Sequence, residues 1–135
     1  RQRQMCIRDS YDAVDNTSLA GDDVVKLIDL PADSMVIGGT LEVLEASGNA
    51  NVTLDVGTST DVDAFVDGGA SNAAADIQFN LKAAGGNLVT SADSIQVTVL
   101  DSGSSGTTAL RFRVHAVICD ISVNPVESAT VSTGT

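Results

Sequence analysis

Short runs in which apolar and polar residues alternate occupy most of the chain. Residues 52–56 read Val-Thr-Leu-Asp-Val, and the same two-residue period recurs at 77–81, 95–99 and 110–118. Successive side chains of a strand point to opposite faces of a sheet, so this period is typical of strands with one buried face and one face in water. These segments are therefore predicted to be β-strands.

The segments between these runs are rich in Gly, Asp, Asn and Ser, as at 47–51 and 101–106. Such residues favour tight turns, and no stretch of the chain has a convincing helical period. We expect about eight short strands separated by turns. The fold class predicted is all-β, an antiparallel β-sandwich of jelly-roll or Greek-key type.

The longest predicted strand, within 108–122, changes character along its length. One face carries apolar residues throughout, from Leu110 to Ile118. The opposite face carries Arg111, Arg113 and His115 and then becomes apolar. We expect its first half to be partly exposed, and its second half to be buried on both faces beneath a loop or a neighbouring subunit.

The opening residues, "RQRQMCIRDS", differ in composition from the rest of the chain. Their back-translation resembles a transposase-based sequencing adapter joined in frame to an environmental insert. We interpret residues 1–9 as an adapter-derived artefact rather than natural protein. The expected organisation is then a lead-in segment at 10–22, one β-sandwich domain at 23–122 and a polar tail at 123–135.

The charge balance is strongly acidic. The formal net charge is −11, and without residues 1–9 it becomes −13, with four basic and seventeen acidic residues. A chain of this charge has no basic surface for nucleic acid or for an anionic membrane. No apolar run approaches the roughly 20 residues that a membrane-spanning helix needs. We therefore expect neither nucleic acid nor membrane among its partners.

Residues that carry catalysis are scarce. The chain has one histidine and no tryptophan, and outside residues 1–9 its one cysteine is Cys119. No nucleophile, phosphate-loop or zinc-protease motif occurs. Cys119 lies in an apolar stretch and is interpreted as a small buried hydrophobe. We expect a protein that is not an enzyme and has no cofactor.

The acidic stretch at 55–67 offers the nearest approach to a metal site. Asp61, Asp63 and Asp67 are candidate Ca²⁺ ligands, because calcium is bound by several oxygen atoms. The spacing does not match an EF-hand loop, since Phe65 stands at the fifth position counted from Asp61. The alternative interpretation is a solvated acidic turn without a metal.

Arg111, Arg113 and His115 form a cationic row on the predicted last strand. One interpretation is an interaction surface that pairs with acidic groups of another chain, such as a second copy of this protein. The other is cross-strand pairing with acidic residues of the same sheet, a kind of contact that stabilises by about 0.2–1 kcal/mol per pair.

Four segments in succession resemble small structural proteins of tailed phages: "KLIDLPADSMVIGGTLEVLEA", "ANVTLDVGTSTDVDAFVDG", "SADSIQVTVLD" and "LRFRVHAVICDIS". The resemblance extends over about residues 24–122. It implies a virion component, such as a capsid decoration or stabilising protein or a head or tail accessory. It also implies capsid or other virion proteins as partners. Symmetric homo-oligomers are the default for such proteins, and a trimer at a capsid symmetry point is one such arrangement.

A second class of function fits the same fold. Secreted or cell-surface β-sandwiches, including carbohydrate-binding and adhesin-like modules, have similar strand patterns. Sugar-binding faces usually carry exposed aromatic side chains for stacking. Aromatic residues make up 3% of this chain, which disfavours that alternative.

Overall fold

The computed structural model describes residues 3–12 as backbone, together with residues 18–81 and 88–121. Within these ranges there are nine strands and no helix. The strands are β1 (Arg3–Asp12), β2 (Val24–Leu30), β3 (Ser34–Glu45), β4 (Val52–Gly57), β5 (Val66–Ala70), β6 (Ala75–Gln78), β7 (Leu88–Val89), β8 (Asp93–Asp101) and β9 (Arg111–Asp120). The described part therefore contains no helix that could cross a membrane.

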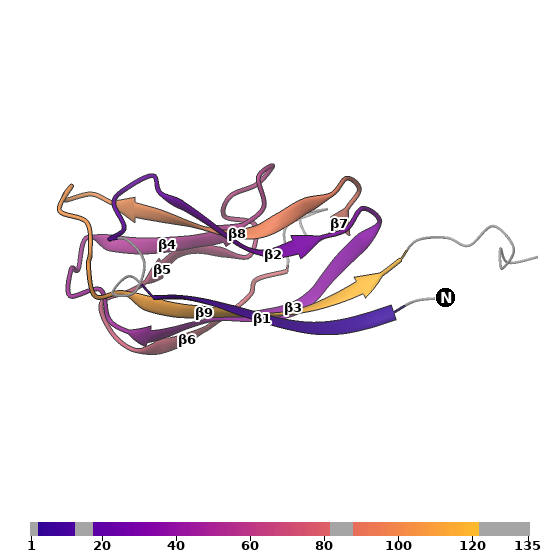
Figure 1. Ribbon diagram of the computed structural model, residues 1–135, viewed down its shortest axis with the longest axis horizontal. Coiled ribbons are helices and arrows are strands. Elements are labelled where there is room, and N and C mark those ends of the chain that lie inside the picture. Colours follow the sequence, from indigo (N-terminus) through magenta and orange to yellow (C-terminus); the bar gives the residue numbers. More distant parts are fainter. Residues whose placement is uncertain (1–2, 13–17, 82–87, 122–135) are drawn as a thin grey trace, which may run out of the picture.

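The strands form two antiparallel sheets that lie face to face (Figure 1). Sheet A has the order β1-β9-β3-β6, with the two-residue β7 also paired to β3. Sheet B has the order β2-β8-β4-β5. Among consecutive strands only β4 and β5 are hydrogen-bonded to each other, so the chain crosses repeatedly between the sheets. The predicted antiparallel β-sandwich is confirmed.

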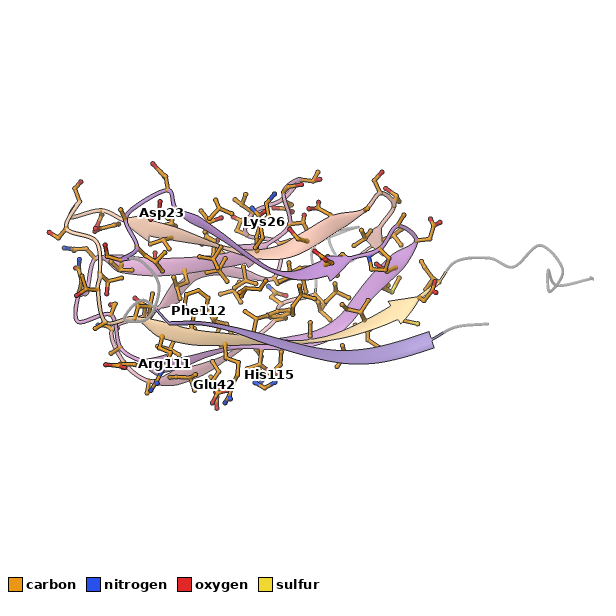
Figure 2. The ribbon with its side chains drawn as sticks, in the orientation of Figure 1. Asp23, Lys26, Glu42, Arg111, Phe112 and His115 are labelled. Atoms are coloured by element: carbon orange, nitrogen blue, oxygen red, sulfur yellow. The ribbon has the colours of Figure 1, made fainter. Side chains whose placement is uncertain are left out.

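The core lies between the sheets and is built from the alternating residues that the sequence pattern identified. Leu110, Phe112, Val114, Ala116 and Ile118 are all fully buried on the inner face of β9 and the residue before it. The inner faces of β4 and β8 contribute buried Val, Leu and Ile residues in the same alternation. Figure 2 shows Phe112 between the two layers. Burial of these apolar side chains is the main stabilising contribution to the sandwich.

The pair Gly38-Gly39 lies at a bulge in β3 and allows a close approach to its backbone. The register of β3 against β9 shifts between Val36 and Gly38. At Gly39 an added Cβ would collide with the ring of Phe79. That ring stacks on Phe65, with the ring centroids 5.0 Å apart. The glycine therefore lets an aromatic pair close this side of the core.

One strand lies where the sequence pattern predicts none. β1 pairs with β9 in an uninterrupted antiparallel register from Arg3 opposite Asp120 to Asp12 opposite Arg111. The sheet thus extends to residues before the domain boundary expected at 23. The pairing of β1 with β9 does not show whether residues 1–9 are natural protein, because backbone hydrogen bonds form between strands of any origin. The adapter interpretation of residues 1–9 therefore stays a prediction.

Truncation of a core residue tests this arrangement. Leu41→Ala removes a fully buried side chain of β3 and is expected to lower the free energy of unfolding by about 2–5 kcal/mol. Leu88→Ala is the matched control, because Leu88 is 42% exposed and should change stability by about 0.5 kcal/mol or less. Denaturant unfolding measures both. Equal effects of the two substitutions would contradict the assignment of the core.

Candidate interaction faces

The cationic row lies on the outer face of sheet A. Arg111, Arg113 and His115 alternate along β9 with the buried residues, so they point away from the core. In Figure 2, Arg111 and His115 project from the lower layer next to Glu42. The register places Glu42 of β3 opposite Arg113 and Glu45 opposite Arg111. Two acidic residues of the same sheet therefore lie beside the row.

Glu42 is the centre of the ionic contacts. Its Oε2 accepts hydrogen bonds from Arg113 Nε at 2.9 Å and Arg113 Nη2 at 2.6 Å. His115 Nε2 lies 3.2 Å from the same oxygen. The hydrogen bonds from Arg113, and then from His115, hold the pKa of Glu42 below its ordinary value. The described residues thus contain the cross-strand pairing that the sequence offered as one interpretation.

The remaining arginine of the row makes a looser contact. Arg111 Nη2 is 3.8 Å from Glu45 Oε2, and both side chains are almost half exposed. Solvent-exposed pairs of this kind contribute little to stability. The second interpretation of the row, a surface that pairs with another chain, stays a prediction.

Beyond His115 the outer face of β9 becomes apolar, as expected, but its side chains are half-buried rather than buried. Val117 and Cys119 lie on this part of the face. Leu88, Met35 and Cys119 are in register across β7, β3 and β9. We call Leu88, Met35, Val117 and Cys119 the apolar end of sheet A. The expectation that Cys119 is fully buried is therefore too strong for this chain taken alone.

The acidic loop, residues 58–67, connects β4 to the start of β5, and its first residues fold back over Gly57 at the end of β4. Gly57 allows the close approach, since an added Cβ would collide with the backbone of Asp61 and Val62. Thr58 N–H donates to the Asp61 carbonyl at 2.8 Å, and Asp61 N–H donates to Thr58 Oγ1 at 3.2 Å. Hydrogen bonds between Thr58 and Asp61 therefore hold the start of the loop in a tight turn.

The carboxylates near this loop crowd one another. Burial raises the pKa of Asp55, and the charges of Asp67 and Asp63 raise it further, while a hydrogen bond of 2.7 Å from Gly68 N–H opposes the shift. A hydrogen bond with Asp63 raises the pKa of Asp61. Burial is the main cause of the Asp55 shift and the hydrogen bond with Asp63 is the main cause of the Asp61 shift, while the charges of neighbouring carboxylates add to both.

The candidate calcium ligands Asp61, Asp63 and Asp67 are near one another in sequence. In residues 18–81 and 88–121 no group of three or more His, Cys, Asp or Glu side chains is arranged to hold a metal ion. Asp61, Asp63 and Asp67 are exposed on the loop and its end. This geometry favours the solvated acidic turn.

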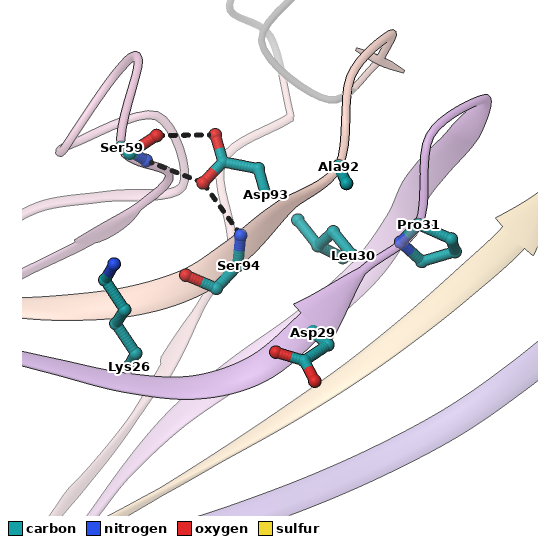
Figure 3. A pocket seen from close by; sticks show the side chains of 8 residues that line it. All are labelled: Lys26, Asp29, Leu30, Pro31, Ser59, Ala92, Asp93 and Ser94. Atoms are coloured by element: carbon teal, nitrogen blue, oxygen red, sulfur yellow. Dashed lines mark hydrogen bonds between the residues drawn. The ribbon is translucent and has the colours of Figure 1, made fainter.

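An open depression of about 630 Å³ lies beside the acidic loop (Figure 3). Asp93 at its wall accepts hydrogen bonds from Ser59 Oγ at 2.9 Å, Ser59 N–H at 3.2 Å and Ser94 N–H at 2.7 Å. Partial burial opposes ionisation of Asp93, but these hydrogen bonds together keep its pKa lowered. Its other lining residues are Lys26, Asp29, Leu30, Pro31 and Ala92. Sequence reasoning missed this depression because its walls come from three distant segments.

The described aromatic side chains provide no platform for stacking on sugar rings. Phe65 and Phe112 are fully buried, and Phe79 is packed against the core. A carbohydrate-binding face usually needs such rings at the surface. This observation weighs against the carbohydrate-binding alternative.

The comparisons with known proteins are structural. No family model matches the chain, and no curated protein matches its sequence. The fold is similar to a chain of the capsid of Ralstonia phage GP4, with a TM-score of 0.66 and 16% identity over 90% of this chain and 86% of that chain. It is also similar to a chain of the acidic stable capsid of Helicobacter pylori bacteriophage KHP30 (TM-score 0.55, 13% identity, 92% of this chain and 97% of that chain).

A third similar chain comes from the capsid asymmetric unit of cyanophage Pam1, with a TM-score of 0.58 and 18% identity over 87% of this chain and 84% of that chain. Each match covers most of both chains, so the lengths of the matched proteins are close to that of this chain. At these identities the comparisons show a shared fold.

The ionic cluster on sheet A gives a testable pH dependence. The pKa of Glu42 is lowered in the folded protein, so its ionisation adds stability above its ordinary value of 4.5. That stability is lost as the pH falls through the lower folded value. Glu42→Gln should be less stable than the parent at pH 6, and the difference should shrink toward pH 3. Thermal unfolding across this range measures it, and a difference independent of pH would contradict the pairing.

Proposed function

We propose that this protein is a non-enzymatic structural protein of a bacteriophage virion, bound to the outside of the capsid as a decoration or stabilising protein. The observation that carries the proposal is the similarity of fold, over most of both chains, to three chains from phage capsids. The sequence resemblance across residues 24–122 points to the same class. Its partners would be capsid or other virion proteins, and its location the virion.

The charge of the chain supports the outer surface rather than the inner one. A protein that lines the inside of a filled capsid faces packaged nucleic acid, whose phosphates carry a high density of negative charge. A chain with a net charge of −11 is repelled by that surface. On the outside the same charge favours solubility and disfavours non-specific attachment.

The fold also suits a passive role. The two sheets enclose one apolar core, and backbone hydrogen bonds within the chain tie the described loops to the strands. Such a domain can bind a shell without rearranging. We propose that it binds as a homo-oligomer, with a trimer as the arrangement to test first, because closed symmetric assemblies are the usual form of such proteins.

Analysis of purified particles tests the location. Particles from the source sample are separated on a density gradient, and their proteins are quantified by peptide mass spectrometry. We expect peptides of this chain to follow the particle band in a fixed ratio to the shell protein. Treatment with a mild chaotrope should release this chain while the shell and its nucleic acid remain intact.

Two outcomes would overturn the proposal. Absence of the peptides from the particle band would exclude a virion protein. Release of this chain only when the particle opens would place it inside, against the argument from charge.

A further inference from the structure

A buried carboxyl group lies on the outer face of sheet B. Asp55 stands in β4 between Leu54 and Val56, whose side chains fill the core, so its own side chain points to the opposite face. It is nevertheless only 6% exposed. Aspartate on an outer sheet face usually lies in water, and a buried carboxylate is costly unless other groups compensate its charge.

A bulge in the neighbouring strand supplies one partner for this carboxyl group. The register of β4 against β5 shifts at Asp55, so that two residues of β5, Asp67 and Gly68, stand opposite this one residue. Gly68 has a φ of +65°, a conformation that a residue without a Cβ adopts at little cost. Its N–H donates a hydrogen bond of 2.7 Å to Asp55 Oδ1. Asp55 therefore fastens the bulge of β5 to β4.

No positive charge of the described residues compensates the charge of Asp55. The ion pairs in residues 18–81 and 88–121 lie on sheet A, and none of them includes Asp55. The charges that act on it are those of Asp67, in the bulge, and Asp63, in the acidic loop. The outward residues of β8 beside it are uncharged, and they are Gln96, Thr98 and Leu100. Ionised Asp55 is therefore both dehydrated and repelled by its neighbours.

The residue opposite Asp55 on β8 carries an unused hydrogen-bonding group. Thr98 is in register with Asp55, and among the described residues its Oγ1 is buried without a hydrogen-bond partner. Residues directly opposite each other on antiparallel strands have Cβ atoms about 4.5–5.5 Å apart, so rotation of the side chains brings the two groups within reach. A neutral carboxyl group has an O–H that a carboxylate lacks, and a hydroxyl oxygen accepts such a donor.

We propose that Asp55 is a proton-sensitive latch between β4, β5 and β8. When its carboxylate binds a proton from solvent, the neutral carboxyl group accepts from Gly68 N–H and donates to Thr98 Oγ1. This change ties three strands together and removes one negative charge beside Asp67. The folded chain is therefore held more firmly by this group in acidic solution than at neutral pH.

The surroundings of Asp55 determine the sign of the pH dependence. Burial raises the pKa of Asp55 above its ordinary value of 3.8, the charges of Asp67 and Asp63 raise it further, and the hydrogen bond from Gly68 opposes the shift. A group with a raised pKa stabilises the fold below its ordinary value, and this contribution is lost as the pH rises through the folded value. Glu42 acts in the opposite direction, so the latch is measured on Asp55 itself.

An NMR titration of the full chain in buffer with a chelator tests the latch directly. The ¹³Cγ signal of Asp55 is expected to give a midpoint above 3.8, and the amide signal of Gly68 should shift with the same midpoint. In Thr98→Val the midpoint of Asp55 should be lower than in the parent, because the neutral carboxyl group loses its acceptor. A parent midpoint at or below 3.8, or a higher midpoint in Thr98→Val, would overturn the proposal.

The variant Asp55→Asn imitates the neutral carboxyl group at every pH. Its thermal unfolding midpoint is expected to exceed that of the parent by at least about 3 °C at pH 7 and by less than about 1 °C at pH 3, where the parent binds the proton itself. Asp29→Asn is the matched control, because it makes the same change at an exposed position of β2 and should alter stability little at either pH.

A folded Asp55→Asn variant that is no more stable than the parent at pH 7 would contradict the latch, as would a gain that is the same at pH 3. If this variant does not fold, the titration of the parent and of Thr98→Val decides. These measurements concern a single copy of the chain, so their outcome is independent of the virion assignment.

Discussion

The antiparallel pairing of β3 with β9 is the constraint on which the rest of the structure depends. It joins β3, in the first third of the chain, to β9 in the centre of sheet A, with partners 66 residues apart at Glu45–Arg111 and 86 apart at Ser34–Asp120. On one side it supplies the core row that includes Leu41 and Phe112. On the other side it brings Glu42 beside Arg113 and His115. The same register therefore determines the hydrophobic core and the chemistry of one outer face.

Because β3 lies beside β9, the cationic row is paired with a carboxylate of the same sheet and is also partly exposed. Within the chain Glu42 partly neutralises the row, which removes a cost of exposing a line of positive charges on one strand. The pairing leaves the side chains near the surface, with Arg113 and His115 about one-third exposed.

Alternation along the chain predicted the fold class and most of the core, because a two-residue period directly reports which side of a strand is buried. The inward rows of β4, β8 and β9 were all evident in this way. The pattern could not identify β1, because its residues lack a clear two-residue period. It also predicted a strand that continues through Phe79, whereas β6 ends at Gln78. The pattern also could not predict which strands pair. The alternation within β9 shows that Arg113 points outward, but it does not show that Glu42 of β3 lies opposite. For the same reason the depression around Asp93 could not be foreseen.

A cryo-electron-microscopy reconstruction of the intact particle tests most directly the central claim that this acidic sandwich is bound to the outside of a phage capsid. The account predicts density for two packed sheets on the outer surface of the shell. Density for this fold on the inner surface of the shell, or its absence from the particle, would contradict the account.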